Sequence, residues 1–203
     1  SKSCIVQKFP YLFLKLDIAK AFDSVKWDYL MEVLQVLGFG PKWRSWVTTL
    51  LATATTSVFL NGSRGRWFRH YTGLRQGDPL SPMLFIIAME PLQHLLHLAT
   101  VDGELEQIPT RSARLRLSLY ADDAAIFLRP KKEEVAKVLE VLTTFGRVSG
   151  LLTNTSKSAV YPISCDSINI DAVMVEFRCP IKAFPCTYLG LPLHTRQLRR
   201  VDV

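Results

Sequence analysis

Three aspartates stand where two short apolar segments end. Asp17 follows Leu12-Phe13-Leu14-Lys15-Leu16, and the pair Asp122-Asp123 follows Leu115-Arg116-Leu117-Ser118-Leu119-Tyr120-Ala121. Leucines occupy every second position in both segments, which is the period of a β-strand with one buried face. Asp17 and Asp122 therefore fall on the face without leucines, and this parity favours Asp122 over Asp123, which the turn must reorient.

Aspartates on neighbouring strands would form a site for divalent cations. Adjacent strands lie about 4.8 Å apart, and carboxylates at that distance repel each other unless a cation lies between them. Two Mg²⁺ ions about 3.5–4 Å apart can assist an in-line phosphoryl transfer. A simpler interpretation stays open, because Asp is common in turns: Asp122-Asp123 would be a polar turn and Asp17 a strand terminator.

The surrounding pattern predicts an α+β fold, an antiparallel sheet with helices packed on one face. Strands and helices alternate without the regular period of a barrel or a solenoid. No linker divides the chain, so we expect one region over residues 1–203, with truncated flanks at 1–11 and 191–203. Expected strands are 12–17, 115–122, 124–128, 158–163 and 188–191; expected helices run from the N-cap Ser24 to Gly38, over 41–51, from Pro82 into the nineties and over 132–148; a hairpin with its turn at 61–65 is expected over 57–71.

Composition indicates a globular protein with a polyanionic partner. Of 203 residues, 48% are apolar and 21% charged, with a net charge of +7, which excludes a disordered chain and favours association with polyanions. Four scattered cysteines predict reduced thiols rather than a disulfide framework. The most apolar stretch, 83–99, contains Glu90, His94 and His97, so we expect no membrane-spanning segment.

Five segments in order resemble the palm motifs of reverse transcriptases, with the wording of LINE-type (non-LTR) retroelements, plant ones in particular. Together they cover most of the chain. They are Leu16-Asp17-Ile18-Ala19-Lys20-Ala21-Phe22-Asp23-Ser24-Val25, Gly73-Leu74-Arg75-Gln76-Gly77-Asp78-Pro79-Leu80-Ser81-Pro82, Tyr120-Ala121-Asp122-Asp123, Gly150-Leu151-Leu152-Thr153-Asn154-Thr155-Ser156-Lys157-Ser158 and Tyr188-Leu189-Gly190.

The resemblance implies an RNA-directed DNA polymerase palm that transfers deoxynucleotides to a primer 3′-OH with two Mg²⁺ ions, or Mn²⁺. Its partners would be an RNA template, a DNA primer and a deoxynucleoside triphosphate. Asp17, Asp122 and Asp123 match the metal-binding triad, and the carbonyl of Ile18 matches a further metal ligand. Lys157 matches a proton donor or charge partner for the leaving pyrophosphate.

The resemblance also assigns residues to nucleotide binding. Phe22 matches a ring beneath the incoming sugar, where bulk excludes a 2′-OH; a plain core aromatic is the alternative. Gln76 and Gly77 match a loop against the nucleotide and template, in which Arg75 and Asp78 fix the loop.

Basic residues form a further candidate nucleic-acid surface. Arg64, Arg66 and Arg69 alternate with aromatic residues around Trp67, and with Arg75 they suit phosphate binding and base stacking. An exposed hairpin with half-buried rings explains the same pattern. Weaker candidates are Arg129, Lys131, Lys132, Arg196, Arg199 and Arg200. A metal site at His94 and His97, or a zinc knuckle at Cys179 and Cys186, lacks the other ligands it would need.

The resemblance covers only part of such an enzyme. Most of the fingers would precede the first motif and the thumb would follow the last, and we find no endonuclease segment. We therefore expect weak or no activity from this fragment alone. The alternative is a non-catalytic retroelement relic that at most binds nucleic acid. The resemblance implies a nuclear and cytoplasmic protein that is not secreted.

Overall fold

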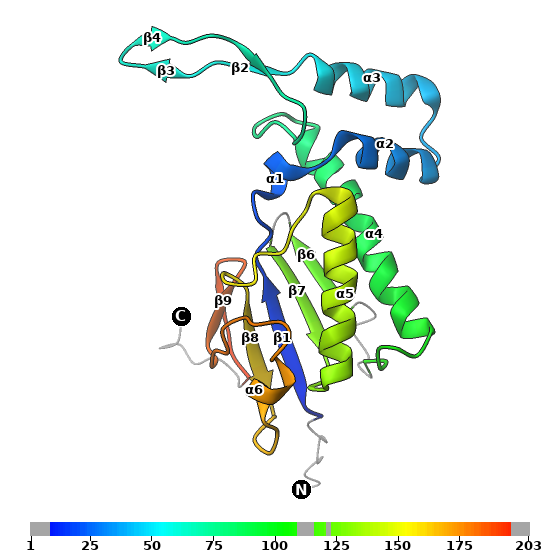
Figure 1. Ribbon diagram of the computed structural model, residues 1–203, viewed down its shortest axis with the longest axis vertical. Coiled ribbons are helices and arrows are strands. Elements are labelled where there is room, and N and C mark those ends of the chain that lie inside the picture. Colours follow the sequence, from blue (N-terminus) through cyan, green and yellow to red (C-terminus); the bar gives the residue numbers. More distant parts are fainter. Residues whose placement is uncertain (1–8, 109–115, 121–122, 196–203) are drawn as a thin grey trace, which may run out of the picture. The chain divides into compact units, whose positions relative to one another are not determined.

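A computed structural model describes residues 9–108, 116–120 and 123–195 (Figure 1). Asp122 of the expected triad lies outside the described residues, as do Cys4, Arg196, Arg199 and Arg200. The chain forms two compact units, each assembled from separate segments. The first unit takes its described residues from 1–18, 93–142 and 153–203, and the second comprises 19–92 and 143–152.

A four-stranded antiparallel sheet is the centre of the first unit. Its strands are β1 (Tyr11–Leu16), β6 (Leu117–Tyr120), β7 (Asp123–Leu128) and β8 (Ala159–Ile163), in the order β6-β7-β1-β8. The sequence pattern predicted these four strands within a few residues. The central position of β1 follows from its pairing with β7 on one side and β8 on the other.

The leucine face of the sheet is covered by helix α5 (Lys132–Ser149). Leu12, Leu14 and Leu16 are buried there, as the alternation predicted. The first half of α5 lies along this face (Figure 1) and buries Val135 and Val138. The expected packing of a helix on the leucine face of an antiparallel sheet is therefore confirmed.

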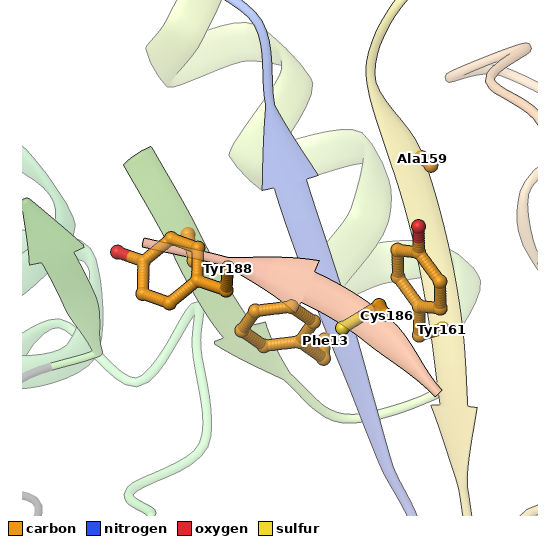
Figure 2. Close-up of a cluster of buried hydrophobic side chains, with 6 residues drawn as sticks. Phe13, Ala159, Tyr161, Cys186 and Tyr188 are labelled. Atoms are coloured by element: carbon orange, nitrogen blue, oxygen red, sulfur yellow. The ribbon is translucent and has the colours of Figure 1, made fainter. Parts of the chain in front are cut away.

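The opposite face is covered in part, by the hairpin of β9 (Cys186–Tyr188) and β10 (Leu191–Leu193). Figure 2 shows β9 crossing β1 above Phe13, with Tyr161 beside it. Phe13 shares the predicted open face but is only 3% exposed. We also expected a single strand over 188–191; the structure instead turns at Leu189-Gly190, where both φ angles are positive. Only the end of this face beyond Phe13 stays open.

A buried ion pair joins β6 to the start of α5. Arg116 was expected on the same face as Ser118, but its side chain is buried and its Nη1 lies 3.2 Å from Glu134 Oε2. Glu134 also accepts hydrogen bonds from the backbone N–H groups of Glu106 and Arg129. Arg129 and Lys131, two of the weaker nucleic-acid candidates, both pair with Glu106. Their charges are thus balanced within the protein.

The second unit begins with three helices. They are α1 (Ala21–Ser24), α2 (Trp27–Val36) and α3 (Pro41–Ala52). The predicted N-cap at Ser24 is wrong: Ser24 ends α1 and its hydroxyl donates to the carbonyl of Ala19, while Lys26 is the N-cap of α2. The helix predicted from Pro41 is confirmed, with Gly40 as its N-cap.

A long hairpin follows α3, as predicted, and extends beyond the helix (Figure 1). Strand β2 (Thr55–Thr56) pairs with β5 (Phe68–Arg69), and β3 (Phe59–Leu60) pairs with β4 (Ser63–Arg64). The turn comprises Asn61 and Gly62, whose φ angles of 49° and 79° are those of a type I′ turn. It is therefore shorter than the turn expected over 61–65.

Helix α4 (Ser81–Val101) continues through Pro91. It is long and apolar enough to cross a membrane by length and composition alone, a test that core helices of soluble proteins also pass. Along its length Leu84, Phe85, Ala88, Met89, Leu92 and Leu96 are buried in the protein, which is the arrangement of a core helix. The short α6 (Ile170–Val173) completes the helices of the described chain.

Candidate active site

The open end of the sheet holds a pocket of about 210 Å³ that contains two of the predicted carboxylates. Asp17 directly follows β1, and Asp123 is the first residue of β7. Because Leu16 pairs with Ala124, the antiparallel register places Asp17 and Asp123 side by side. The pocket is lined by Lys15, Leu16, Asp17, Ile18, Asp123, Lys157, Ala159, Tyr161 and Lys182.

Asp123 faces the pocket because of its place in β7. It shares a strand face with Ala125 and Phe127, whose partners on β1 are Lys15 and Phe13. The expectation that a turn must reorient Asp123 is therefore wrong, since the strand already includes this residue. Asp122, which we expected to face the ions more directly, is outside the described residues.

The pocket also contains three lysines. In the pairing of β1 with β8, Lys15 lies opposite Ala159, so the same register brings Lys157 next to Asp17. Lys182 reaches the pocket from the segment beside β8, where its N–H donates to the carbonyl of Val160. The site therefore combines oxygen ligands for a cation with positive groups suited to phosphate oxygens.

The main chain of Asp17 is held by the segment before β8. Its N–H donates to Ser158 Oγ at 3.0 Å, and its carbonyl accepts from the N–H of Asn154 at 2.8 Å. The Ser158 hydroxyl donates in turn to the carbonyl of Asn154 at 2.8 Å. Ile18, predicted to offer its carbonyl to a metal, lines the pocket and forms a β-bridge with Thr153. These contacts fix the backbone from which the Asp17 carboxylate emerges.

Lys15 is a pocket residue that the sequence interpretation missed. Its Nζ lies 3.8 Å from Asp123 Oδ1 and donates to the carbonyl of Thr187 at 3.0 Å. The signal was present, because Lys15 is two residues before Asp17 and a strand places such residues on one face. Thr187 belongs to β9, and the neighbouring Tyr188 hydroxyl donates to Ser118 Oγ on β6. Lys15 thus links the pocket to the hairpin that covers the sheet.

The pocket fits a hard divalent cation. Two carboxylates at an open, polar position suit Mg²⁺, which takes few protein ligands and retains waters or phosphates. Among the described residues no three His, Cys, Asp or Glu side chains form a metal-binding group, and Asp122 is outside them.

The histidines and cysteines form no site in the described part of the chain. His94 and His97 are exposed on α4. Cys165, Cys179 and Cys186 are free and buried, and burial raises the pKa of each thiol, that of Cys179 to about 11. The predicted buried thiols are confirmed for these three residues.

In the second unit, the loop that begins at Gly73 is fastened to the segment after Phe22. The N–H of Gly73 donates to the carbonyl of Val25 at 2.8 Å, and its carbonyl accepts from Trp27 Nε1 at 2.7 Å. A Cβ on Gly73 would lie 2.6 Å from the carbonyl oxygen of Asp23, so only glycine allows this approach. Gln76 Nε2 donates to Asp23 Oδ1 at 3.5 Å.

The predicted nucleotide residues therefore share one region of the second unit. Phe22 is half-buried and stacks on Phe85, with ring centroids 4.6 Å apart. Gly77 is exposed with a φ of +86°, and a Cβ there would meet nothing within 4 Å. Asp78 accepts from the N–H of Leu80, as a loop-fixing residue would, whereas Arg75 is exposed.

Comparison with known proteins identifies the family. The family model described as reverse transcriptase (RNA-dependent DNA polymerase) matches residues 4–193. The uncharacterized 149 kDa protein of transposon TX1 from Xenopus laevis is 34% identical over 82% of this chain. A retrovirus-related Pol polyprotein of the type-1 retrotransposable element R2 from Popillia japonica is 31% identical over 91% of it. The chain spans 12% and 26% of the lengths of these two relatives.

Solved structures share the fold at low sequence identity. Apo telomerase from Candida tropicalis, truncated from its C-terminal domain, superposes with a TM-score of 0.59 at 16% identity, over 79% of this chain and 32% of that one. Telomerase from the same organism in complex with a fragment of telomeric RNA gives a TM-score of 0.58 at 15% identity, over 81% and 28%. With the antiparallel sheet, these matches establish an α+β polymerase palm. The chain belongs to the reverse transcriptase (RNA-dependent DNA polymerase) family, in its LINE-type, non-LTR branch.

Proposed function

We propose that the chain is the palm region of an RNA-directed DNA polymerase that adds deoxynucleotides to the 3′-OH of a DNA primer on an RNA template. The observation that carries the proposal is the shared pocket of Asp17, Asp123 and Lys157 in a chain of the reverse transcriptase family. The RNA partner is supported by the solved telomerase neighbour, whose structure includes a fragment of telomeric RNA.

Asp17 and Asp123, together with Asp122 and the carbonyl of Ile18, would hold two Mg²⁺ or Mn²⁺ ions. Such ions supply charge stabilisation to the attacking and leaving oxygens of an in-line phosphoryl transfer. The protein contributes a fixed backbone at Asp17, held through Ser158 and Asn154. A carboxylate held in place before substrate binds needs no rearrangement during the reaction.

The lysines of the pocket serve the triphosphate. Lys157 lies beside Asp17 and donates a proton or a positive charge to the leaving pyrophosphate, while Lys182 offers a second positive charge in the pocket. Lys15 is a positioning residue, because its ammonium contacts Asp123 and the carbonyl of Thr187 at the same time.

The second unit would supply the nucleotide contacts. Phe22, whose ring is stacked on Phe85, excludes a 2′-OH by its bulk, and Gln76 and Gly77 lie against the nucleotide and template. Gly77 suits this role because it is exposed and has no side chain to obstruct a ligand.

Substitution of the pocket aspartates tests the proposal. In a chimaera that joins this chain to fingers and thumb segments of an R2 relative, Asp17→Asn and Asp123→Asn should each lower primer extension on RNA at least about 100-fold, the scale of losing one charge contact in a transition state. The matched control is Asp102→Asn, which removes an exposed carboxylate outside the pocket and should leave extension unchanged.

A second measurement separates the enzyme from a relic. Mn²⁺ binding to the 203-residue chain, followed by electron paramagnetic resonance, should weaken in Asp17→Asn and Asp123→Asn but not in Asp102→Asn. Undiminished extension by the pocket variants would refute the polymerase. Absence of both extension and Mn²⁺ binding in the unaltered chain would instead support the non-catalytic relic.

A further inference from the structure

The positive charge of the chain is concentrated in one segment without carboxylates. Between Glu32 and Asp78 the sequence contains no Asp or Glu. The same segment contains six basic residues, close in number to the net charge of +7 of the whole chain. They are Lys42, Arg44, Arg64, Arg66, Arg69 and Arg75.

Three of these arginines lie on the hairpin that follows α3. Arg64 is in β4, Arg69 is in β5, and Arg66 lies between the two strands. All three are exposed, and within the described part of the chain their salt-bridge partners would have to come from outside the segment; none forms such a bridge there. In the ribbon view the hairpin extends freely beyond α3 (Figure 1). Its charge is therefore available to a ligand.

Aromatic rings alternate with these cations. The side chains of Phe59 and Trp67 are 62% and 59% exposed. The Arg64 guanidinium lies 5.1 Å from the centre of the Phe59 ring and 5.0 Å from that of Trp67. The pairing of β3 with β4 places Phe59 directly opposite Arg64. The hairpin thus presents flat rings and guanidinium groups together to solvent.

This combination selects the ligand. Exposed cations without a neighbouring carboxylate attract a polyanion, and exposed rings stack on bases only where those bases are unpaired. A duplex hides the base faces, and a protein partner would have to bring its own acidic groups. We propose that the hairpin surface of Phe59, Arg64, Arg66, Trp67 and Arg69 binds single-stranded nucleic acid, independently of the carboxylate pocket.

Charge reversal tests the electrostatic half of the proposal. The full 203-residue chain is titrated onto a labelled single-stranded RNA of about 20 nucleotides, long enough for one such site, in EDTA and without nucleotides. Arg66→Glu/Arg69→Glu should weaken binding at least about tenfold and reduce the salt dependence by about two counterions. The control Arg147→Glu/Arg178→Glu changes two exposed arginines elsewhere and lowers the net charge equally. It should weaken binding less than about threefold. Equal losses in the two variants would overturn the proposal, because binding would then follow net charge alone.

Removal of a ring tests the stacking half. Trp67→Leu keeps the charge and changes an exposed side chain, so the fold should survive, as circular dichroism will verify. We expect RNA affinity to fall about five- to tenfold, the scale of one base–aromatic stack, and the affinity for inorganic polyphosphate to stay unchanged. Unchanged RNA affinity, or an equal loss for polyphosphate, would overturn the proposal. Because no divalent cation is present, a negative result leaves the polymerase proposal to its own test.

Discussion

Ser158 connects two segments that are 141 residues apart in the sequence. Its hydroxyl is both the acceptor for the N–H of Asp17 and a donor to the carbonyl of Asn154. Its side chain is 1% exposed, so water cannot replace either partner. The position of a pocket carboxylate thus depends on a residue with no chemistry of its own.

Ser158→Ala should therefore destabilise the chain by about 1–3 kcal/mol, the cost of leaving a buried backbone donor unsatisfied. The measurement is the free energy of unfolding in urea. Ser156→Ala is the control, because Ser156 is exposed although its hydroxyl also bonds Asn154, through Oδ1. We expect a cost below about 0.5 kcal/mol there. Equal costs for the two variants would show that the Ser158 bonds contribute nothing specific.

The sequence predicted the pocket residues that carry a recognisable type at a recognisable spacing. Asp17, Asp123 and Lys157 were all named, and the structure places them in one pocket. Lys15 was missed because a lysine on a strand is usually only a solvated charge, although the period of two pointed to it. Ser158 was beyond sequence reasoning, because its partner is defined by the pairing of β1 with β8.

At the scale of elements, Gly150 shows how tightly α5 is joined to the chain after α1. Gly150 follows α5 with a φ of +88°, and a Cβ there would lie 2.1 Å from the carbonyl oxygen of Ser24. No side chain fits that space. Gly38, at the end of α2, has nearly the same φ of +86° but nothing within 4 Å of its added Cβ.

Comparison of Gly150→Ala with Gly38→Ala therefore isolates the close approach from the backbone strain. Both substitutions incur the cost of a left-handed residue, about 1–2 kcal/mol, and Gly150→Ala must also displace a backbone. We expect Gly150→Ala to lower the free energy of unfolding by at least about 2 kcal/mol more than Gly38→Ala, a difference on the scale of core overpacking. Chemical denaturation of both variants provides the measurement, and similar losses would contradict the packing seen here.

Strong periodicity explains which elements were predicted well. The strands with alternating leucines and the stripe of Val135, Val138 and Leu142 on α5 were found because one face of each is buried. The cap at Ser24 was wrong because the chain first forms the short α1, after Lys20 adopts a left-handed conformation. The burial of Phe13 was missed because its cover, β9, comes from a distant part of the sequence.

At the scale of the whole molecule, buried thiols make stability depend on alkaline pH. Burial raises the pKa of Cys179 from its ordinary value near 9 to about 11. The unfolded chain therefore loses this proton first as the pH rises, and the stability that the folded state gains from the neutral thiol is lost between about pH 9 and pH 11.

The free energy of unfolding should accordingly fall between about pH 8 and about pH 10, and Cys179→Ala should make that fall smaller. The decline should persist in part, because burial also raises the pKa of Cys165, Cys186 and Tyr161. Urea titrations at the two pH values measure the change for each protein. An identical decline in the variant would exclude Cys179 as a contributor.

The pairing of β1 with β8 has a consequence for synthesis on the ribosome. Asp17, at the end of β1, meets Ser158 only after 141 further residues have been added. At roughly 5–20 residues per second, that wait lasts roughly 7–30 s. Throughout it, one edge of the central strand has no partner to bond, and translation that terminates before Ala159 makes the exposure permanent. Such prematurely terminated products should be insoluble and depend on chaperones, whereas the finished polypeptide closes its own sheet.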